Sequence, residues 1–424
     1  STWTLSGKAN TKFKDVSVSG GVLALGPDQT ALQSETGLID GGKVIVTGNG
    51  APSSADWSVE QSLVVGNIKA GELEISNGGA VKVGGDLIIG SQNSASGTVN
   101  IAGSQSSLTV DGMLAVGDSG NGTMIVSNGA QVQSGKVAIG RNTGSTGSVL
   151  ITGAGTKWAA RDIYVSGGNA DNDGGHGSLT IADGAVVGSP GGMIDVGDNG
   201  AYGVLNIGAA EGESAVAPGI FAGRYLMLSP FTDTVFNHNA TDYNFEASIL
   251  GSANLKFLSG KTKLTGASSS FDGNATVSNS TVEVAERAKL NGTWTVNHGG
   301  RLEGSGQVGA TTINAGAVLA PTGTRSLTLN GGLTLNAGGS ILPSDAASLI
   351  VNGKATFNSG GLYTYNLATG GSGTTATTVV NGDVALNGTT LNVTGTPAIG
   401  YHRLISYTGS LTQTNGGLNV GTTP

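Results

Sequence analysis

Apolar and polar residues alternate in short runs through most of the chain. A clear run begins at Gly71, and its alternating apolar positions are Leu73, Ile75, Val81, Val83, Leu87 and Ile89. A period of two is the pattern of a β-strand that buries one face. The segment therefore predicts three short strands that are separated by turns.

The same pattern recurs at a nearly constant interval. Its copies begin at Gly71, Gly97, Gly122, Gly147, Gly177 and Gly203, with separations of 26, 25, 25, 30 and 26 residues. Three short strands cannot bury their inward side chains alone, but stacked copies close a core and pair their backbones in parallel ladders.

This repeat predicts an all-β chain that forms a right-handed parallel β-helix, a solenoid with about three strands per coil. Each coil would advance by one strand spacing of ~4.8 Å, which gives a rod on the order of 80 Å long. An antiparallel sandwich or a propeller is the alternative. Propeller blades repeat at roughly 40 residues or more, so the shorter period favours one coil per repeat.

The pattern divides the chain into five segments. We expect N-terminal capping coils over 1–70, regular coils over 71–208, an irregular loop-rich insertion over 209–250, shorter strand repeats over 251–345, and C-terminal coils over 346–424. The segment 209–250 is rich in aromatic residues and is interpreted as a long excursion or a poorly matching coil. Its aromatic side chains either cap a local core or form a binding loop.

Composition argues against an ordinary globular enzyme. Gly accounts for 75 of 424 residues and charged residues for only 11%. The Gly residues lack a collagen register, and 38% hydrophobic residues is too many for a disordered linker. Val, Ile and Leu set between Gly, Asn, Asp and Ser are typical of short strands joined by tight turns.

Cysteine is absent and the formal net charge is −8. The missing thiols exclude thiolate catalysis and Cys-based metal sites, and they suit an exported chain that must avoid disulfide traps. The acidic balance opposes nucleic acid as a partner. Without a signal peptide at Ser1 or an apolar run of membrane-spanning length, the sequence reads as a mature, soluble fragment.

One tetrapeptide resembles a catalytic motif. The run from Gly117 to Gly120 reads Gly-Asp-Ser-Gly, as around the nucleophile of trypsin-like proteases. A catalytic triad also needs a base positioned by a third group. None of the four His residues lies in a protease-like context, and other repeats carry polar turns at the same place, so we interpret Asp118 and Ser119 as turn residues.

Acidic residues offer two further alternatives, a polysaccharide-cleaving site and a calcium loop. Asp171 and Asp173 could flank a glycosidic bond, but the third strands carry at most one acid each, so we expect no catalysis. The run 169–174 resembles half of an EF-hand loop, yet the expected Glu is missing. We predict a polar loop there, with no metal and no cofactor.

Stacked coils align the loops that follow each third strand, and these loops are the main candidate binding site. Its predicted members are Asn93, Asp118, Asn121, Arg141, Asn142, Asn169, Asp171, Asn172, Asp173, Asp198, Asn199 and Tyr202. Amide and carboxylate groups suit hydrogen bonding to sugar hydroxyls, and Tyr202 could stack on a sugar face. The same residue types are also what tight turns require.

A second candidate site combines two cations with an aromatic residue. Lys157 and Arg161 flank Trp158 and would suit a sulfated glycan or an acidic protein segment. The alternative is that Trp158 packs across a coil and leaves only the two cations for a ligand.

Two stretches carry a resemblance to a known family. The run from Leu258 to Leu342 resembles the strand repeat of Gram-negative autotransporter passengers, with a G-x-L-x-G-x-G-x-V-like segment at 301–308 followed by a Pro-containing strand at 317–321. The tail from Val351 to Val420 is similar to the C-terminal stabilising, autochaperone-like region of pertactin-like passengers. The regular repeats of the AIDA group are not evident.

The resemblance implies a non-catalytic adhesin of the type V secretion pathway. Such a passenger is exposed at the bacterial cell surface or released, is not itself membrane-inserted, and is tethered by a translocating β-barrel that this chain lacks. It would bind a host extracellular-matrix protein such as fibronectin, or a glycosaminoglycan or other glycan, through its polar loops. The alternative is a self-associating passenger that mediates cell aggregation and biofilm formation.

Overall fold

The structure is a computed structural model of the chain. It describes residues 1–5, 11–26, 32–48, 56–168, 174–189, 192–197, 201–267, 270–323, 325–343, 347–368, 376–396 and 400–424, with only the backbone of residue 11. The chain divides into two compact units, Ser1–Asn237 and His238–Pro424. Both units are built of β-strands, and the described residues contain no helix.

The strands of the first unit are short. They are β1 (Thr2–Leu5), β2 (Thr11–Val18), β3 (Val22–Leu25), β4 (Leu32–Ile39), β5 (Lys43–Thr47), β6 (Trp57–Val59), β7 (Leu63–Val65), β8 (Gly71–Ser76), β9 (Ala80–Val83), β10 (Leu87–Ile89), β11 (Ser96–Ala102), β12 (Ser107–Val110), β13 (Leu114–Val116), β14 (Asn121–Ser127), β15 (Gln131–Ile139), β16 (Thr146–Thr152), β17 (Lys157–Val165), β18 (His176–Ala182), β19 (Val186–Gly188), β20 (Met193–Val196), β21 (Tyr202–Gly208), β22 (Ile220–Phe221), β23 (Tyr225–Leu228) and β24 (Asp233–Asn237).

The strands of the second unit follow. They are β25 (Tyr243–Phe245), β26 (Ser248–Gly251), β27 (Asn254–Ser259), β28 (Lys261–Leu264), β29 (Ser270–Phe271), β30 (Asn274–Val277), β31 (Thr281–Val284), β32 (Lys289–Val296), β33 (Arg301–Gly304), β34 (Gln307–Ile313), β35 (Val318–Pro321), β36 (Leu327–Asn330), β37 (Leu333–Leu335), β38 (Ser340–Ile341), β39 (Leu349–Asn352), β40 (Ala355–Phe357), β41 (Leu362–Asn366), β42 (Ala376–Val380), β43 (Val384–Leu386), β44 (Thr389–Thr394), β45 (Arg403–Tyr407), β46 (Leu411–Gln413) and β47 (Leu418–Val420).

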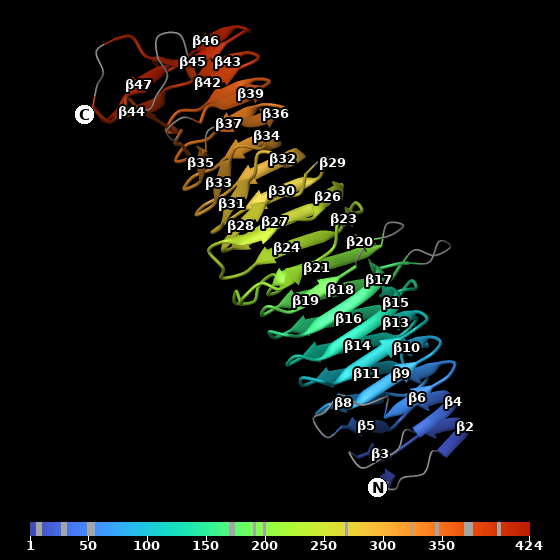
Figure 1. Cartoon of the computed structure of the whole chain (residues 1–424). Coiled ribbons are helices and arrows are strands. Elements are labelled where there is room, and N and C mark those ends of the chain that lie inside the picture. Colours follow the sequence, from blue (N-terminus) through green and yellow to red (C-terminus); the bar gives the residue numbers. More distant parts are fainter. Residues whose placement is uncertain are drawn as a thin grey trace. The chain divides into compact units, whose positions relative to one another are not determined.

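In the first unit each repeat forms one coil of a parallel solenoid. Strand β8 pairs in parallel with β11, β11 with β14, β14 with β16, β16 with β18, and β18 with β21, and these strands lie as successive rungs in Figure 1. The second and third strands pair in the same way, β9 with β12 and β10 with β13. The predicted parallel β-helix with about three strands per coil is confirmed.

The inward positions of each strand form columns that run through the coils. One column aligns Leu73, Val99, Met124, Val149, Leu179 and Leu205, and each of these side chains is at most 1% exposed. Complete burial of such a side chain contributes roughly 1.5–3 kcal/mol. A register slip of one residue would turn the whole column toward solvent, so the alternating pattern specifies the register.

Two tryptophans occupy one such column on the second strand. Trp57 is in register with Val81 and Trp158 with Val132, and both indoles are almost completely buried. The indole N–H groups donate to hydroxyls inside the solenoid, Trp57 to Ser34 at 3.2 Å and Trp158 to Ser134 at 3.0 Å. Buried indoles need such a partner, so both rings are core residues.

The predicted insertion over 209–250 contains strands that continue the solenoid. Within the first unit, β22, β23 and β24 pair in parallel with β19, β20 and β21. The irregular part is the run between Gly208 and Ile220, where one antiparallel bridge joins Ala182 to Pro218. Phe221 is buried in register with Val187, which is itself in register with Trp158, so Phe221 continues the column that holds the two tryptophans.

The second unit repeats the parallel arrangement. Strands β25, β28, β31, β33, β35, β38, β41, β44 and β47 form one sheet in that order, and β28, β31, β33 and β35 can be followed as rungs in Figure 1. The strands β27, β30, β32 and β34 form a second parallel ladder.

A column of asparagines runs along the second unit and was missed from the sequence. The side-chain amide of each member donates to the amide oxygen of the previous one, and the column consists of Asn297, Asn314, Asn336, Asn358 and Asn387, with donor–acceptor distances from 2.8 to 3.3 Å. Each of the middle amides is therefore both donor and acceptor. The recurring Asn-x-Gly sequence at 297, 314, 336 and 358 is the signal that marks this column.

One face of the second unit carries a network of paired charges. Lys261 Nζ lies 2.9 Å from Glu283 and 2.8 Å from Glu303, Lys263 Nζ lies 2.9 Å from Glu283, and Arg301 Nε lies 2.6 Å from Glu303. Burial raises the pKa of Glu283 and of Glu303, but hydrogen bonds from the cations outweigh it, so both pKa values lie below the usual range. These pairs combine three cations with two carboxylates, and each carboxylate contacts two cations.

His238 begins the second unit as a buried, neutral imidazole. Its Nε2 lies 2.8 Å from Thr262 Oγ1, and its ring packs at 5.0 Å from the ring of Tyr243. The Nδ1 atom is buried without a hydrogen-bond partner among the described residues. Burial lowers the pKa of His238 to about 4, because desolvation disfavours the charged ring.

Candidate functional site

The predicted binding loops lie where one coil of the first unit passes into the next. We call this region the junction edge and define it as the turns at 90–95, 117–120 and 140–145, the described ends of the turns at 166–175 and 197–201, and the first residue of each following strand. The turns begin at glycines with positive φ, such as Gly117 and Gly140. Their N–H groups donate at 2.8 Å to carbonyls of the preceding coil, that of Ile89 and that of Val116.

A glycine is required at these turns because the next coil passes very close. A Cβ atom at Gly117 would lie 2.3 Å from the carbonyl oxygen of Thr146, and one at Gly140 would lie 2.4 Å from that of His176. Such contacts are far inside van der Waals distance, and the positive φ values of 73° and 68° also disfavour any side chain. The glycines therefore hold successive junction turns in tight alignment.

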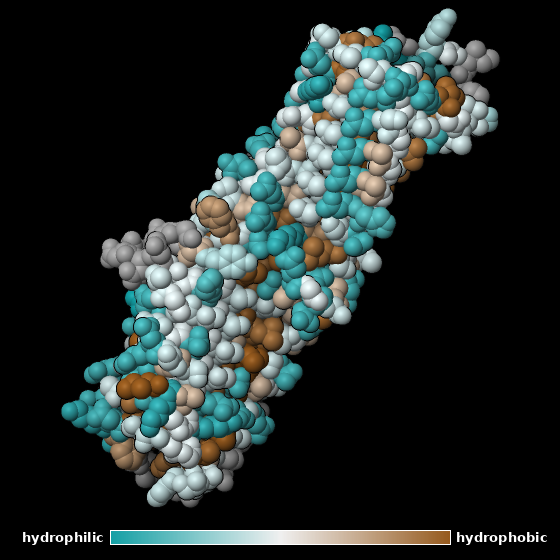
Figure 2. All heavy atoms as spheres, turned by 180° about the vertical axis from the view of Figure 1, so that it is seen from behind, coloured by the Kyte–Doolittle hydropathy of each residue, from teal (hydrophilic) through white to brown (hydrophobic). Residues whose placement is uncertain are grey.

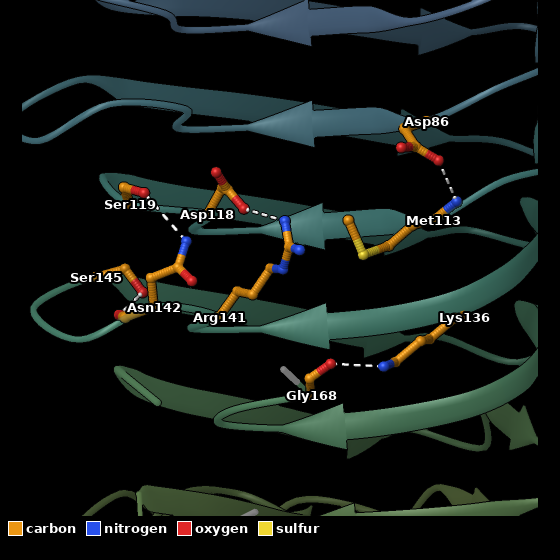
Figure 3. A network of polar contacts seen from close by, with 9 residues as sticks. All are labelled: Asp86, Met113, Asp118, Ser119, Lys136, Arg141, Asn142, Ser145 and Gly168. Carbon is orange, nitrogen blue, oxygen red and sulfur yellow. Dashed lines mark hydrogen bonds and ion pairs between the residues drawn. The ribbon is translucent and has the colours of Figure 1, made fainter. Parts of the chain in front are cut away.

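Three predicted site residues, Asp118, Arg141 and Asn142, make contacts across this alignment, the last with Ser119. Arg141 Nη1 donates to Asp118 Oδ1 at 2.8 Å, and Asn142 Nδ2 donates to the Ser119 hydroxyl at 3.1 Å. Figure 3 shows both pairs bridging two successive turns. Asp118 and Arg141 are partly buried, so these groups are fixed in place before any ligand arrives. The contact of Ser119 with an amide also fits the interpretation of Gly117–Gly120 as a turn.

Asn93 and Asn121 are the exposed polar members of the edge. Asn93 lies in the turn between β10 and β11, and Asn121 begins β14 in register with Ser96 on one side and Thr146 on the other. Their side chains face solvent and offer both a donor and an acceptor. They are therefore available to hydroxyl-rich or peptide ligands.

Tyr202 continues the column of first-strand residues. It begins β21 in register with His176, and its side chain is 44% exposed. The phenolic hydroxyl donates to Asp233 Oδ2 at 3.3 Å, while the His176 ring meets the Tyr202 ring edge-on at 5.8 Å. Phe231, which the binding prediction did not include, is 79% exposed in the turn before β24.

Six predicted site residues lie outside the described residues. They are Asn169, Asp171, Asn172, Asp173, Asp198 and Asn199. The start of the first loop is described. There Lys136 Nζ donates to the Gly168 carbonyl at 2.5 Å (Figure 3). The same Nζ lies 4.6 Å from the centre of the Tyr164 ring.

The second candidate site is not assembled as one patch. Trp158 is 1% exposed and points into the core, so no ligand can reach its ring. Lys157 and Arg161 are both exposed on β17, but four residues of extended chain separate them by roughly 13 Å. Arg161 Nε also lies 3.4 Å from the neighbouring Asp162 carboxylate.

Other site types find no support among the described residues. No group of three or more His, Cys, Asp or Glu residues is placed to hold a metal ion in the part of the chain that the structure describes. None of the described segments is a helix that could cross a membrane. Two hollows of about 490 and 390 Å³ lie against the last strands and the first strands, away from the junction edge.

Part of this chain is similar in sequence to a known bacterial protein. No family model matches the chain. A curated protein of Brucella suis biovar 1 (strain 1330), the adhesin BmaC autotransporter, is 29% identical over 262 residues, which is 60% of this chain. The chain resembles an autotransporter passenger. The family resemblance predicted from the sequence is thereby confirmed.

The match covers a small part of the relative. The chain spans 7% of the length of the Brucella protein. Among solved structures, a TibA fragment hyper-glycosylated by TibC aligns over 99% of both chains, at 14% identity and with a TM-score of 0.18. With so low a score the two backbones do not superpose as whole chains, and the parallel solenoid is identified by the strand registers given above.

Proposed function

We propose that this chain is the non-catalytic adhesive part of a cell-surface or secreted autotransporter passenger. In this proposal the junction edge contacts a host extracellular-matrix protein of the fibronectin kind, or a glycosaminoglycan or other glycan. The sequence likeness to an autotransporter adhesin supports the class, and the export of passengers accounts for a location at or beyond the cell surface.

The observation that supports the proposal most directly is that polar groups are held in fixed positions on the junction edge. The strand backbones are used in coil-to-coil ladders, and the inward side chains are used in the core. The junction turns carry exposed polar side chains such as Asn93, and the Asp118–Arg141 and Asn142–Ser119 pairs fix neighbouring turns. Recognition residues commonly lie on loops held by such a scaffold.

A binding panel tests this function. Beads coated with the chain are applied to surfaces bearing fibronectin, other matrix proteins, heparin or host cells, with albumin-coated beads as the control. We expect adhesion to at least one host surface. We also expect weaker adhesion when Asn169, Asp171, Asn172 and Asp173 are all replaced by Gly. Beads that bind no host surface would refute the function, and unchanged binding by the glycine variant would remove that loop from the site.

A second function, self-association, is favoured by a different observation. The two central outward positions of each first strand from β11 to β18 carry no charged side chain, and they are Thr98, Asn100, Thr123, Ile125, Ser148, Leu150, Ser178 and Thr180. An uncharged, flat sheet face lets two chains approach without repulsion. Sedimentation of the purified chain separates the two functions: a concentration-dependent dimer that clumps beads in the absence of host ligand supports self-association.

A further inference from the structure

Three aromatic rings occur at the same junction of three successive coils. His176 and Tyr202 are directly in register at the starts of β18 and β21. Val204 of β21 is in register with Asp233 of β24, and Phe231 precedes Asp233 by two residues, as Tyr202 precedes Val204. We call His176, Tyr202 and Phe231 the aromatic ledge.

The ring of Tyr202, the central residue of the ledge, contacts two neighbouring residues and is still exposed to solvent. The Tyr202 hydroxyl donates to Asp233, a residue that is buried, and the His176 ring packs edge-on against the Tyr202 ring. These contacts restrict the rotation of Tyr202, so a ligand that stacks on it loses little additional side-chain freedom. With 44% of the side chain exposed, the ring offers a preorganised apolar face.

Phe231 has a strained backbone conformation and an exposed side chain. Its φ is 68°, in the left-handed region where turns normally place Gly or Asn, and it follows Pro230. Its side chain is 79% exposed, so packing does not account for the ring. Strained non-glycine residues that the surrounding structure maintains are characteristic of functional sites.

The surroundings of the ledge favour a sugar over an apolar protein surface. Along the same column the ledge is continued by Thr146 and Asn121, and its inner neighbours include Ser178 and Asp233. Apolar residues on the face seen in Figure 2 form separate small patches among polar ones rather than one broad area. A pyranose ring needs this combination, an aromatic face for its C–H groups and nearby oxygens or amides for its hydroxyls.

We propose that the aromatic ledge binds a linear carbohydrate whose pyranose rings stack on Tyr202 and Phe231. Successive coils are spaced by ~4.8 Å, which is close to the length of one sugar unit, so neighbouring sugars meet neighbouring coils. His176 and Asp233 are positioning residues that orient Tyr202, and the exposed amide of Asn121 forms hydrogen bonds with sugar hydroxyls. This inference rests on the proposed adhesive function and specifies its ligand class.

The test uses the whole chain on a printed panel of neutral, sialylated and sulfated oligosaccharides. The variants are Tyr202→Ala and Phe231→Gly, with Ile220→Ala as the control, since Ile220 is 51% exposed on the second-strand column. We expect each ledge variant to weaken binding roughly tenfold or more, as the loss of an anchoring ring does at a binding hot spot. Ile220→Ala keeps wild-type binding.

Phe231→Gly also separates a lost contact from a lost fold. Glycine relieves the positive φ, so the melting temperature of this variant stays at or above that of the wild type while carbohydrate binding falls. The carbohydrate site is refuted if the wild-type chain binds no oligosaccharide or binds only protein ligands. It is also refuted if the Tyr202→Ala and Phe231→Gly variants bind oligosaccharides as well as the wild type.

An assay of adhesion to whole cells distinguishes failure of the carbohydrate site from failure of the proposed adhesive function. Beads coated with the chain are tested on host cells before and after periodate oxidation of cell-surface glycans. Adhesion that persists after oxidation and in the ledge variants overturns the carbohydrate site and leaves the adhesive function standing. Oligosaccharide binding that requires the ledge, combined with no adhesion to cells, supports the site and overturns the adhesive function.

Discussion

The guanidinium of Arg141 donates to the carboxylate of Asp118 on the preceding coil at 2.8 Å. Both residues were predicted to bind a ligand, and in the structure they bind each other. Their side chains are only 27% and 15% exposed, so the pair is a fixed element of the junction edge rather than a freely rotating pair of charges. A ligand that binds at this edge therefore contacts side chains that are already fixed in position.

The strength of this pair is measurable with a double-mutant cycle. We expect Asp118→Ala and Arg141→Ala to show a coupling of about 1 kcal/mol in the free energy of unfolding, because the contact is partly shielded from water. The matched control is the Lys82–Asp111 pair, at 3.2 Å with side chains 51% and 50% exposed, for which the coupling should be close to ~0.3 kcal/mol. Equal coupling in urea denaturation would contradict the fixed-pair interpretation.

Two glycines with similar backbone conformations should differ in their tolerance of a methyl group. Gly117→Ala places Cβ 2.3 Å from the Thr146 carbonyl oxygen, whereas at Gly144 no atom lies within 4 Å of such a Cβ. Gly144→Ala carries only the cost of a left-handed residue, about 1–2 kcal/mol. Gly117→Ala adds a backbone clash and should cost roughly 3 kcal/mol or more. Thermal melting of the two variants checks the difference, and similar melting temperatures would show that the coils are less tightly spaced.

The asparagine column of the second unit predicts a position-dependent cost. Asn336→Ala removes the donor to Asn314 and the acceptor of Asn358, and leaves both partly buried amides unsatisfied. We expect a loss of about 1–3 kcal/mol. Asn352 makes comparable 2.8 Å contacts on an exposed face, so Asn352→Ala should cost less than ~1 kcal/mol. If urea denaturation gave the larger loss for Asn352→Ala, the stabilising role of the column would be refuted.

The stability of the second unit should fall in mild acid because of His238. The folded-state pKa of about 4 lies below the unfolded value of 6.5, so the unfolded state takes up the proton first. The stability is therefore full above about pH 6.5 and is lost progressively as the pH falls to about 4, by roughly 3 kcal/mol in total. Glu283 and Glu303 have lowered pKa values and contribute acid sensitivity only below about pH 4.5.

A non-titrating variant isolates the histidine. His238→Gln retains a group able to hydrogen-bond with Thr262 but cannot be protonated in this range. Denaturation midpoints of the two chains between pH 7 and pH 5 should diverge, with the wild type losing more stability on acidification. Parallel curves for the two chains would exclude His238 as the titrating group.

The solenoid itself was predictable because its physical cause is local and repeated. Leu73 and Ile75 alternate with polar residues, and the same alternation returns at Gly97 and Gly122 because each coil must present apolar side chains to the same column. The stretch from 220 to 237 was harder to interpret. There an irregular run between Gly208 and Ile220 precedes Phe221, so the regular spacing of the repeat does not identify the coil.

The binding prediction located the junction turns but not the contacts between them. Asp118 and Arg141 each follow a closing glycine, so stacking alone could have paired them; the sequence argument treated them separately as ligand contacts. Phe231 lies in the aromatic-rich segment for which a binding loop was one alternative, but its exposure depends on a backbone φ that the sequence does not reveal. The asparagine column did have a signal, the recurring Asn-x-Gly, which the sequence argument did not use.

Distances between spin labels along one column test the central claim, that successive repeats of the first unit stack in parallel and in register. Outward positions Glu72, Ser148, Ser178 and Val204 belong to one column, and the chain has no native cysteine to interfere with labelling. Cysteine pairs joining residue 72 to residues 148, 178 and 204 should give backbone separations of about 14, 19 and 24 Å, one strand spacing of ~4.8 Å per coil. Separations that do not increase by one spacing per coil would contradict the stacked solenoid and the junction edge built on it.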